Sequence, residues 1–114
     1  MPYIQARLSV KLDENQKDIL QKKLSDATAS ALSKPKAYIM TEIDDGKSLY
    51  MNENKVNSGA YIAISMLGAT TKPTCQVLTQ SICNILSQDY NIDASCVYIT
   101  YHPTDLWGWN GSMF

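Results

Sequence analysis

The sequence predicts an α/β protein with a single domain over residues 1–114, in which a β-α-β unit occurs twice. Two segments with apolar residues at helical spacing each lie between two segments rich in strand-forming residues. Each helix is long enough to cross back over a sheet, so each unit should pair its strands in parallel. Two helices cover only one face of the resulting four-stranded mixed sheet, and its open face predicts association with further copies of the chain.

The first half of the chain supplies one such unit. A strand is expected over residues 1–10, because the apolar residues of this segment share one face: Pro2, Ile4, Ala6, Leu8 and Val10. A helix is expected over residues 14–32, since Asp13 followed by Gln16 resembles a capping box. The helix should end before Pro35, because a residue that precedes proline disfavours helical geometry. The next strand is expected over residues 37–43 and should end at a turn over residues 44–46.

The second half repeats this order. Residues 47–58 are polar and rich in asparagine, and residues 49–51 are expected to form at most a short edge strand. A clear strand over residues 59–66 is followed by a helix with Pro73 in its first turn, which should fade near residues 89–91. The last strand is expected over residues 95–101, with His102 and Pro103 ending it and an aromatic tail following over residues 107–114.

The composition argues against several classes of protein. The net charge is -1 and no long basic run occurs, so a nucleic-acid binder is not expected. No apolar run approaches the length of a membrane span, so membrane insertion is not expected either. No secretory signal is visible, and 3 cysteines without a Cys-x-x-Cys pair predict reduced thiols in the cytoplasm. With His102 as the only histidine, we expect no metal site.

Pro2 is the first candidate for chemistry. If Met1 is removed, Pro2 becomes a free secondary amine at the end of a half-buried strand. The lone pair of such an amine is a general base or a nucleophile near neutral pH. Taken alone, Pro2 is simply the residue that follows the first methionine, so its role depends on the rest of the chain.

Several short motifs occur together: Met1-Pro2 opening a strand, Lys34-Pro35 after the first helix, Ser65-Met66 ending the third strand, Val97-Tyr98-Ile99 in the last strand, and Trp107-Gly108-Trp109-Asn110-Gly111-Ser112-Met113-Phe114 at the end. In order and length this pattern resembles the macrophage migration inhibitory factor family of the tautomerase superfamily, over essentially the whole chain. The tail is its most specific part, and the double β-α-β layout alone is its least specific part.

The resemblance implies a homotrimer whose three sheets form a central barrel, with active sites at the subunit interfaces. It implies that Pro2, freed by removal of Met1, is the catalytic base and that Lys34 holds a substrate carboxylate. The remaining residues that it places at the substrate-binding site are Met66, Tyr98, Thr100, Trp107 and Trp109, with Tyr98 supplied by a neighbouring subunit. A site in which a base acts on an acidic aromatic substrate needs a cation that holds the carboxylate and an apolar wall that holds the ring. These residue types supply both. Each type also has an ordinary role in solvated loops or packing.

Three departures from the family pattern affect the expected specificity. Thr100 stands where the best-known members carry an asparagine that hydrogen-bonds a phenolic hydroxyl, so little preference for hydroxylated substrates is expected. Residues 50–54 replace a common Phe-Gly-Gly-Ser, which alters the expected pocket rim. Ser58 and Tyr61 lie where some members carry Cys-x-x-Cys, so a thiol oxidoreductase activity is not supported.

The leading functional hypothesis is therefore a keto-enol tautomerase that acts on 2-keto acids such as phenylpyruvate and needs no cofactor. The alternative is a cytokine-like signalling protein, secreted without a signal peptide, that binds a cell-surface receptor while its pocket is vestigial. Both roles are compatible, since members of the family combine them. A purely structural trimer is a third possibility, but it gives no reason for Pro2, Lys34 and Tyr98 to occur together.

Overall fold

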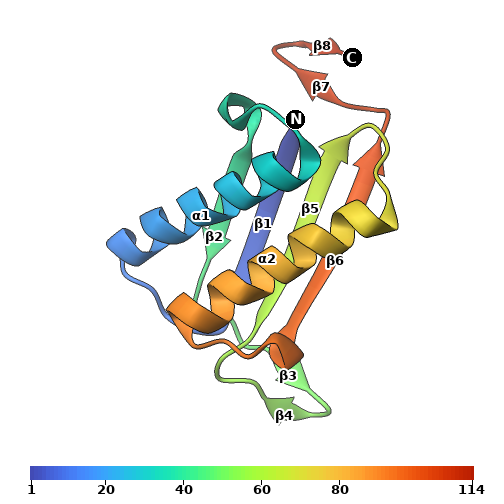
Figure 1. Cartoon of the computed structure of the whole chain (residues 1–114). Helices are drawn as coiled ribbons and strands as arrows, with labels where there is room; N and C mark the ends of the chain where they lie inside the picture. The colour runs from blue at the N-terminus through green and yellow to red at the C-terminus, as the bar shows by residue number, and fades with distance from the viewer.

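The computed structural model describes residues 1–114 and contains the predicted four-stranded sheet (Figure 1). Its strands lie in the order β2 (Met40–Asp44), β1 (Pro2–Leu8), β5 (Ala60–Leu67) and β6 (Val97–Thr104). β1 pairs in parallel with β2, and β5 pairs in parallel with β6. The two β-α-β units meet where β1 and β5 run antiparallel. The predicted mixed sheet and the parallel pairing within each unit are confirmed.

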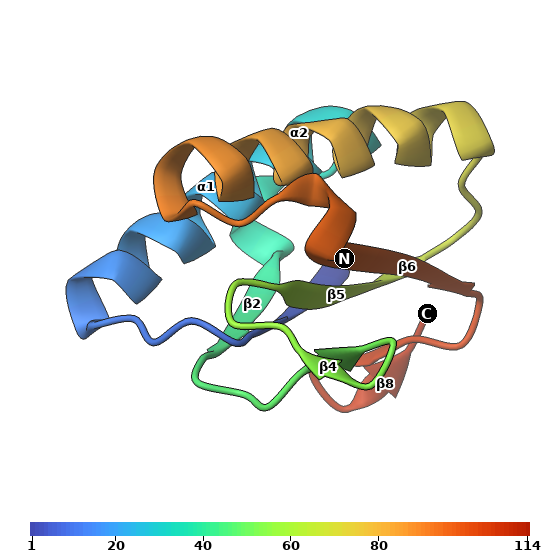
Figure 2. The same cartoon turned by 90° about the horizontal axis from the view of Figure 1, so that it is seen from below.

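Both long helices, α1 (Glu14–Leu32) and α2 (Lys72–Tyr90), cover the same face of the sheet, as Figure 2 shows. Side chains alternate along β1 and β5, so every second residue is buried beneath the helices. The core joins both strands to both helices and includes Ile4, Leu24, Ile64, Leu78 and Ile82, each 0% exposed. The opposite face of the sheet is uncovered, as predicted. Neither helix is long and apolar enough to cross a membrane.

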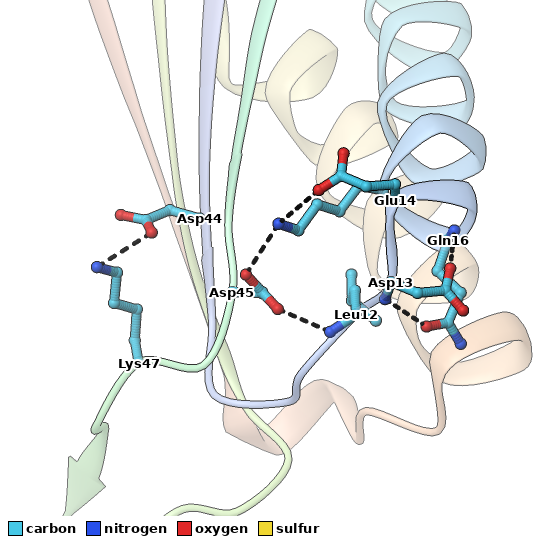
Figure 3. Close-up of polar contacts among 8 residues, drawn as sticks. Leu12, Asp13, Glu14, Gln16, Asp44, Asp45 and Lys47 are labelled. Carbon is cyan, nitrogen blue, oxygen red and sulfur yellow. Dashed lines mark hydrogen bonds and ion pairs between the residues drawn. The ribbon is translucent and has the colours of Figure 1, made fainter.

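The start of α1 follows the predicted capping box (Figure 3). The Asp13 side chain accepts a hydrogen bond from the Gln16 backbone N–H at 2.8 Å, and the Gln16 side chain accepts one from the Asp13 N–H at 2.9 Å. Asp45, just beyond β2, adds a second link because its carboxylate accepts the Leu12 N–H at 2.7 Å. These bonds satisfy donors that the first helical turn leaves free, and they tie α1 to the end of β2.

Two predicted strand boundaries in the first half of the chain are wrong. The segment predicted as a strand over residues 37–43 begins as a short 3-10 helix, η1 (Lys36–Tyr38), and β2 starts only at Met40. The cause is local: the Tyr38 N–H bonds to the carbonyl of Pro35 and the Ile39 N–H to that of Lys36, which closes a tight turn after the proline. The first strand also ends at Leu8 rather than at residue 10.

The last strand was likewise misplaced. Residues 94–96 form a 3-10 helix, η2 (Ala94–Cys96), and β6 then continues through His102 and Pro103 to Thr104. The predicted strand ended at residue 101, before His102 and Pro103, and proline cannot donate a ladder hydrogen bond. β6 is an edge strand, however, and an edge strand tolerates proline where its missing N–H would face away from the sheet.

Two small hairpins extend from opposite ends of the sheet (Figure 1). β3 (Tyr50–Met51) and β4 (Asn54–Lys55) form the first, so the short strand near residues 49–51 exists but is not an edge of the main sheet. β7 (Gly108–Trp109) and β8 (Ser112–Met113) form the second. Asn110 and Gly111 between them have φ values of 52° and 81°, which suit a two-residue hairpin turn.

Candidate active site

A cavity of about 490 Å³ lies at the end of the sheet where β1 begins, and most of its lining is hydrophobic. The start of β1 contributes Pro2 and Tyr3, and β5 contributes Ser65. η1 and the start of β2 contribute Tyr38 and Met40. The C-terminal hairpin closes the wall with its aromatic residues, Trp107 and Trp109. Four segments of the chain therefore meet around this cavity, and Pro2 lies in one of them.

Pro2 itself is buried, and it lies opposite Met66 in the register of β1 and β5. Met66 is 1% exposed and its side chain belongs to the core, so this predicted substrate-binding residue does not line the cavity. The preceding residue, Met1, also lines the cavity, and its carbonyl accepts the Leu67 N–H at 3.4 Å. The nitrogen of Pro2 is thus held by pairing on a central strand.

Lys34 does not line the cavity, but its charge acts on the N-terminal amine, which does. It follows Ser33, the left-handed C-cap of α1 with φ 54°, and its own N–H bonds to the carbonyl of Ala29 at 3.1 Å. Burial, and next the charge of Lys34, lower the pKa of the Met1 α-amine below its ordinary value. Lys34 has no carboxylate within ion-pair distance, whereas nearby Lys36 pairs with Asp26. A half-buried lysine without a partner is available to an anionic ligand.

The aromatic wall is organised around Trp109. The ring of Tyr38 meets it edge-on, with centroids 5.9 Å apart and planes at 82°. The ring of Phe114 stacks on it at 6.3 Å with planes at 13°. The Phe114 N–H also donates to the Trp107 carbonyl at 3.0 Å, which holds the end of the chain against the hairpin. Trp107 and Trp109, two of the predicted substrate-binding residues, both line the cavity.

Tyr98 and Thr100 do not reach this cavity within one chain. Tyr98 lies opposite Tyr61 on β5, and Tyr61 lies opposite Arg7, so Tyr98 belongs to the far end of the sheet from Pro2. Its side chain is 66% exposed on the uncovered face. Thr100 lies on the same face, two residues further along β6. Of the predicted site residues, Pro2, Trp107 and Trp109 line the cavity, whereas Lys34, Met66, Tyr98 and Thr100 do not. Lys34 is still close enough for its charge to act on the N-terminal amine.

Thr100 is the centre of a short hydrogen-bonded chain on the open face. Its hydroxyl oxygen lies 2.8 Å from the hydroxyl of Tyr61 and 2.8 Å from Nε2 of His102. A threonine hydroxyl has one proton to donate, so these partners occupy much of its hydrogen-bonding capacity. His102 takes part in no metal cluster, because no group of three or more His, Cys, Asp and Glu side chains is close enough to hold an ion.

Sequence reasoning did not select Tyr3, Tyr38, Met40 and Ser65 as site residues, although all four line the cavity. Tyr3 and Ser65 had a usable signal. They alternate with buried residues on their strands and lie directly opposite each other beside Pro2. Tyr38 and Met40 had none, because the 3-10 turn that directs η1 toward the cavity was predicted as strand.

The fold and the cavity define a class: two-layer α/β proteins built from a duplicated β-α-β unit, with a mainly apolar pocket beside the first residues of the central strand. The model of the family described as Macrophage migration inhibitory factor (MIF) matches residues 1–114. The chain belongs to the macrophage migration inhibitory factor family, and this membership supports a MIF-like function.

Individual relatives agree with this assignment. Macrophage migration inhibitory factor of Xenopus laevis is 30% identical over 116 residues, covering 100% of this chain and 99% of that protein. Among solved structures, Leishmania major MIF2 superposes with a TM-score of 0.91 at 25% identity, covering 100% of this chain and 97% of that one. The macrophage migration inhibitory factor homologue from Prochlorococcus marinus gives 0.87 at 30% identity, with 98% of each chain covered.

Proposed function

We propose that this protein is a keto-enol tautomerase that acts on aromatic 2-keto acids of the phenylpyruvate type, with Pro2 as general base. The observation that carries the proposal is the position of Pro2 in the wall of a mainly apolar cavity. The unpaired Lys34 supports it, because its charge acts on the amine of the adjacent Met1. Trp107, Trp109 and Tyr38 supply a wall for an aromatic ring. A base, a cation and a ring-binding wall are the groups that such a substrate requires.

The proposed reaction moves one proton. With Met1 removed, the neutral Pro2 amine takes a proton from the carbon next to the keto group, and the electrons of that C–H bond form the carbon–carbon double bond. The carbonyl π electrons move to the keto oxygen, which then receives the proton and becomes the enol hydroxyl. Lys34 orients the substrate carboxylate and stabilises the negative charge that develops on oxygen. Substrate and product are isomers, so no co-reactant is consumed.

The assembly that we propose is a homotrimer. The supporting observation is the separation of Tyr98 and Thr100 from the cavity of their own chain, since both residues could reach a pocket only in another copy. The uncovered sheet face and the edge strands β2 and β6 offer surfaces for such contacts. The exposed apolar residues of the C-terminal hairpin, Trp109, Met113 and Phe114, offer a further one.

The test is the ketonisation of phenylpyruvate enol, or the reverse, measured for wild type and a Pro2→Gly variant with confirmed N-termini. We expect Pro2→Gly to lose at least about a hundredfold in kcat/KM, the usual scale of a general base. Pro103→Gly is a matched control. Met66 of β5 pairs with Pro2 on one side and with Pro103 of β6 on the other, but Pro103 does not line the cavity. Equal rates for wild type and Pro2→Gly would contradict the proposal.

A second candidate is a cytokine-like signal, supported by family membership and by the name of the relatives from Xenopus. In this case the protein would be released from the cytoplasm without a signal peptide and would bind a cell-surface receptor. Binding of wild type and Pro2→Gly to a receptor ectodomain separates the two roles. Binding without any turnover by wild type would favour the signal over the enzyme.

A further inference from the structure

A hydrogen bond on the open face links a residue of the cavity wall to a carboxylate outside it. The Tyr3 hydroxyl donates to the Glu42 carboxylate across β1 and β2. Tyr3 lies opposite Met40 and Gln5 lies opposite Glu42, so the two bonded residues are diagonal neighbours on one face of the sheet. Tyr3 lines the cavity and Glu42 does not. The carboxylate is therefore one phenol ring away from the space that a ligand would occupy.

Two charged residues near the cavity, Lys34 and Glu42, have no ion-pair partner. Lys34 is a cation without an ion-pair partner, and Lys36 is already paired with Asp26. Glu42 is an exposed carboxylate whose hydrogen-bond partner is a neutral phenol rather than a cation. This hydrogen bond raises the pKa of Tyr3, as burial also does to a lesser extent, so the phenol keeps its proton and remains a donor. Lys34 and Glu42 are thus charges without an ion-pair partner near a mainly apolar wall. Arg7 is a further cation on the face of Tyr3, and its charge acts on Tyr3 without forming an ion pair with Glu42.

We propose that Glu42, acting through Tyr3, makes this pocket select 2-keto acids with a single carboxylate and reject those with a second carboxylate on the aromatic tail. The inference rests on the proposed function and assigns its substrate class. Lys34 satisfies one carboxylate. A second carboxylate, on the aromatic tail of the substrate, would be desolvated against the apolar wall and repelled by the like charge of Glu42.

Tyr3 has a defined part in this selection. Glu42 is exposed, and an untethered carboxylate on a surface samples many positions and is screened by solvent and salt. The hydrogen bond to Tyr3 keeps the carboxylate on the cavity side of β2 and also holds the ring of Tyr3 in the wall. Glu42 is thus a positioning residue, because it acts on the ligand through Tyr3 and through its field.

The test uses binding, so it does not depend on turnover. The chain has only 2 tryptophans, and both line the cavity, so quenching of tryptophan fluorescence reports occupancy of this pocket. The probes are phenylpyruvate and its para-carboxylate analogue, and the measured quantity is the ratio of their dissociation constants. The variants are Glu42→Gln, which removes the charge, and Tyr3→Phe, which removes the tether but keeps the ring.

Asp44→Asn is the matched control. Asp44 lies on the same strand and face as Glu42, but its carboxylate pairs with Lys47 at 3.0 Å at the far end of β2 (Figure 3). At low salt we expect wild type to prefer the single carboxylate, and Glu42→Gln to reduce this preference about threefold or more. Tyr3→Phe should reduce it partly, Asp44→Asn should leave it unchanged, and added salt should shrink the effect of Glu42→Gln.

The contrary outcomes are separable. An unchanged ratio in Glu42→Gln, or an equal change in Asp44→Asn, overturns the role of Glu42 while leaving the tautomerase proposal intact. If Tyr3→Phe keeps the wild-type ratio of the two dissociation constants, the part assigned to Tyr3 is overturned. If neither probe binds to the folded wild-type protein, both the inference and the proposed function are overturned. If wild type shows the expected binding preference but does not turn over phenylpyruvate, the proposed function alone is contradicted.

Discussion

Pro2 and Tyr98 lie at opposite ends of the sheet of one chain. Pro2 is opposite Met66, whereas Tyr98 aligns through Tyr61 with Arg7, five positions further along β1. At about 3.3 Å per residue this offset is roughly 16 Å along the strand, before the spacing between strands is added. A site that contains both residues therefore needs two copies of the chain.

The first prediction is that two inactive variants complement each other. Pro2→Gly and Tyr98→Ala should each lose activity, and co-refolded mixtures should regain it at interfaces that combine an intact Pro2 with an intact Tyr98. About a quarter of the sites in a random equal mixture have this composition. Sedimentation should show a trimer. A stable monomer at micromolar concentration, or mixed trimers without recovered activity, would contradict the shared site.

The second prediction concerns the charge at Lys34. Lys34→Ala should raise KM for phenylpyruvate about tenfold or more, because the role is to hold a carboxylate, whereas Lys34→Arg keeps the charge and should stay within about threefold. Lys36→Ala is the control, since Lys36 already pairs with Asp26. Equal kinetics for wild type and Lys34→Ala would remove Lys34 from the site.

The third prediction concerns substrate hydroxyls. Wild type should show little preference for hydroxyphenylpyruvate over phenylpyruvate. The Thr100 side chain is short, and its hydroxyl already contacts Tyr61 and His102 at 2.8 Å each. Thr100→Asn should increase the preference by a few-fold, roughly the value of one neutral hydrogen bond. The measurement is the ratio of the two kcat/KM values. If Thr100→Asn leaves this ratio unchanged, position 100 does not contact the substrate hydroxyl.

The fourth prediction concerns the amine. Burial and Lys34 lower the pKa of the Met1 amine, and Pro2 lies deeper, so both causes should also lower the pKa of a free Pro2 amine. The neutral amine is the base, so kcat/KM should rise with pH through this pKa and reach its plateau below the ordinary amine value of about 8. Lys34→Ala should move the midpoint upward, since it removes a like charge.

The same prediction has a direct control in the state of the N-terminus. In protein that retains Met1, the Pro2 nitrogen is a tertiary amide without basicity, and Met1 lies in the cavity wall. Such protein should be inactive and should bind aromatic ligands weakly. Mass spectrometry of the N-terminus, paired with the assay, checks this. Equal turnover by processed and unprocessed protein would show that Pro2 is not the base.

The fifth prediction concerns acid stability. The Asp45 carboxylate accepts the Leu12 N–H and pairs with Lys17 at 3.2 Å, and these contacts, led by the Leu12 bond, lower its pKa. A lowered folded-state pKa adds stability above the unfolded-state pKa, and this stability is lost as pH falls through the folded-state pKa. Asp45→Asn should therefore lower Tm at pH 7 and have a smaller effect at strongly acidic pH.

Glu53→Gln is the control for Asp45→Asn, because Glu53 is an exposed carboxylate at the turn of the β3–β4 hairpin. It removes the same charge without touching the α1–β2 link, so Tm should stay nearly constant at both pH values. An Asp45→Asn effect that is independent of pH would show that the link depends on the shape of the side chain rather than on its charge.

Local patterns were sufficient for most of the fold. The capping box at Asp13 predicted the start of α1, and alternation along residues 1–10 predicted the buried face of β1, because both signals come from neighbours in the chain. The same reasoning failed at residues 36–38 and at Pro103. A proline-led turn competes with strand propensity at the first position, and an edge strand tolerates proline at the second.

The sequence by itself determined the two β-α-β units, the buried face of the sheet and the family, and therefore which residue types to examine. Only the tertiary structure decided which of them meet. It placed Tyr38 against Trp109, linked Tyr3 to Glu42 across two strands, and separated Tyr98 from Pro2. The physical reason is strand register. Which residues lie opposite each other depends on pairing between segments that are distant in the chain, and no local pattern of residues encodes that pairing.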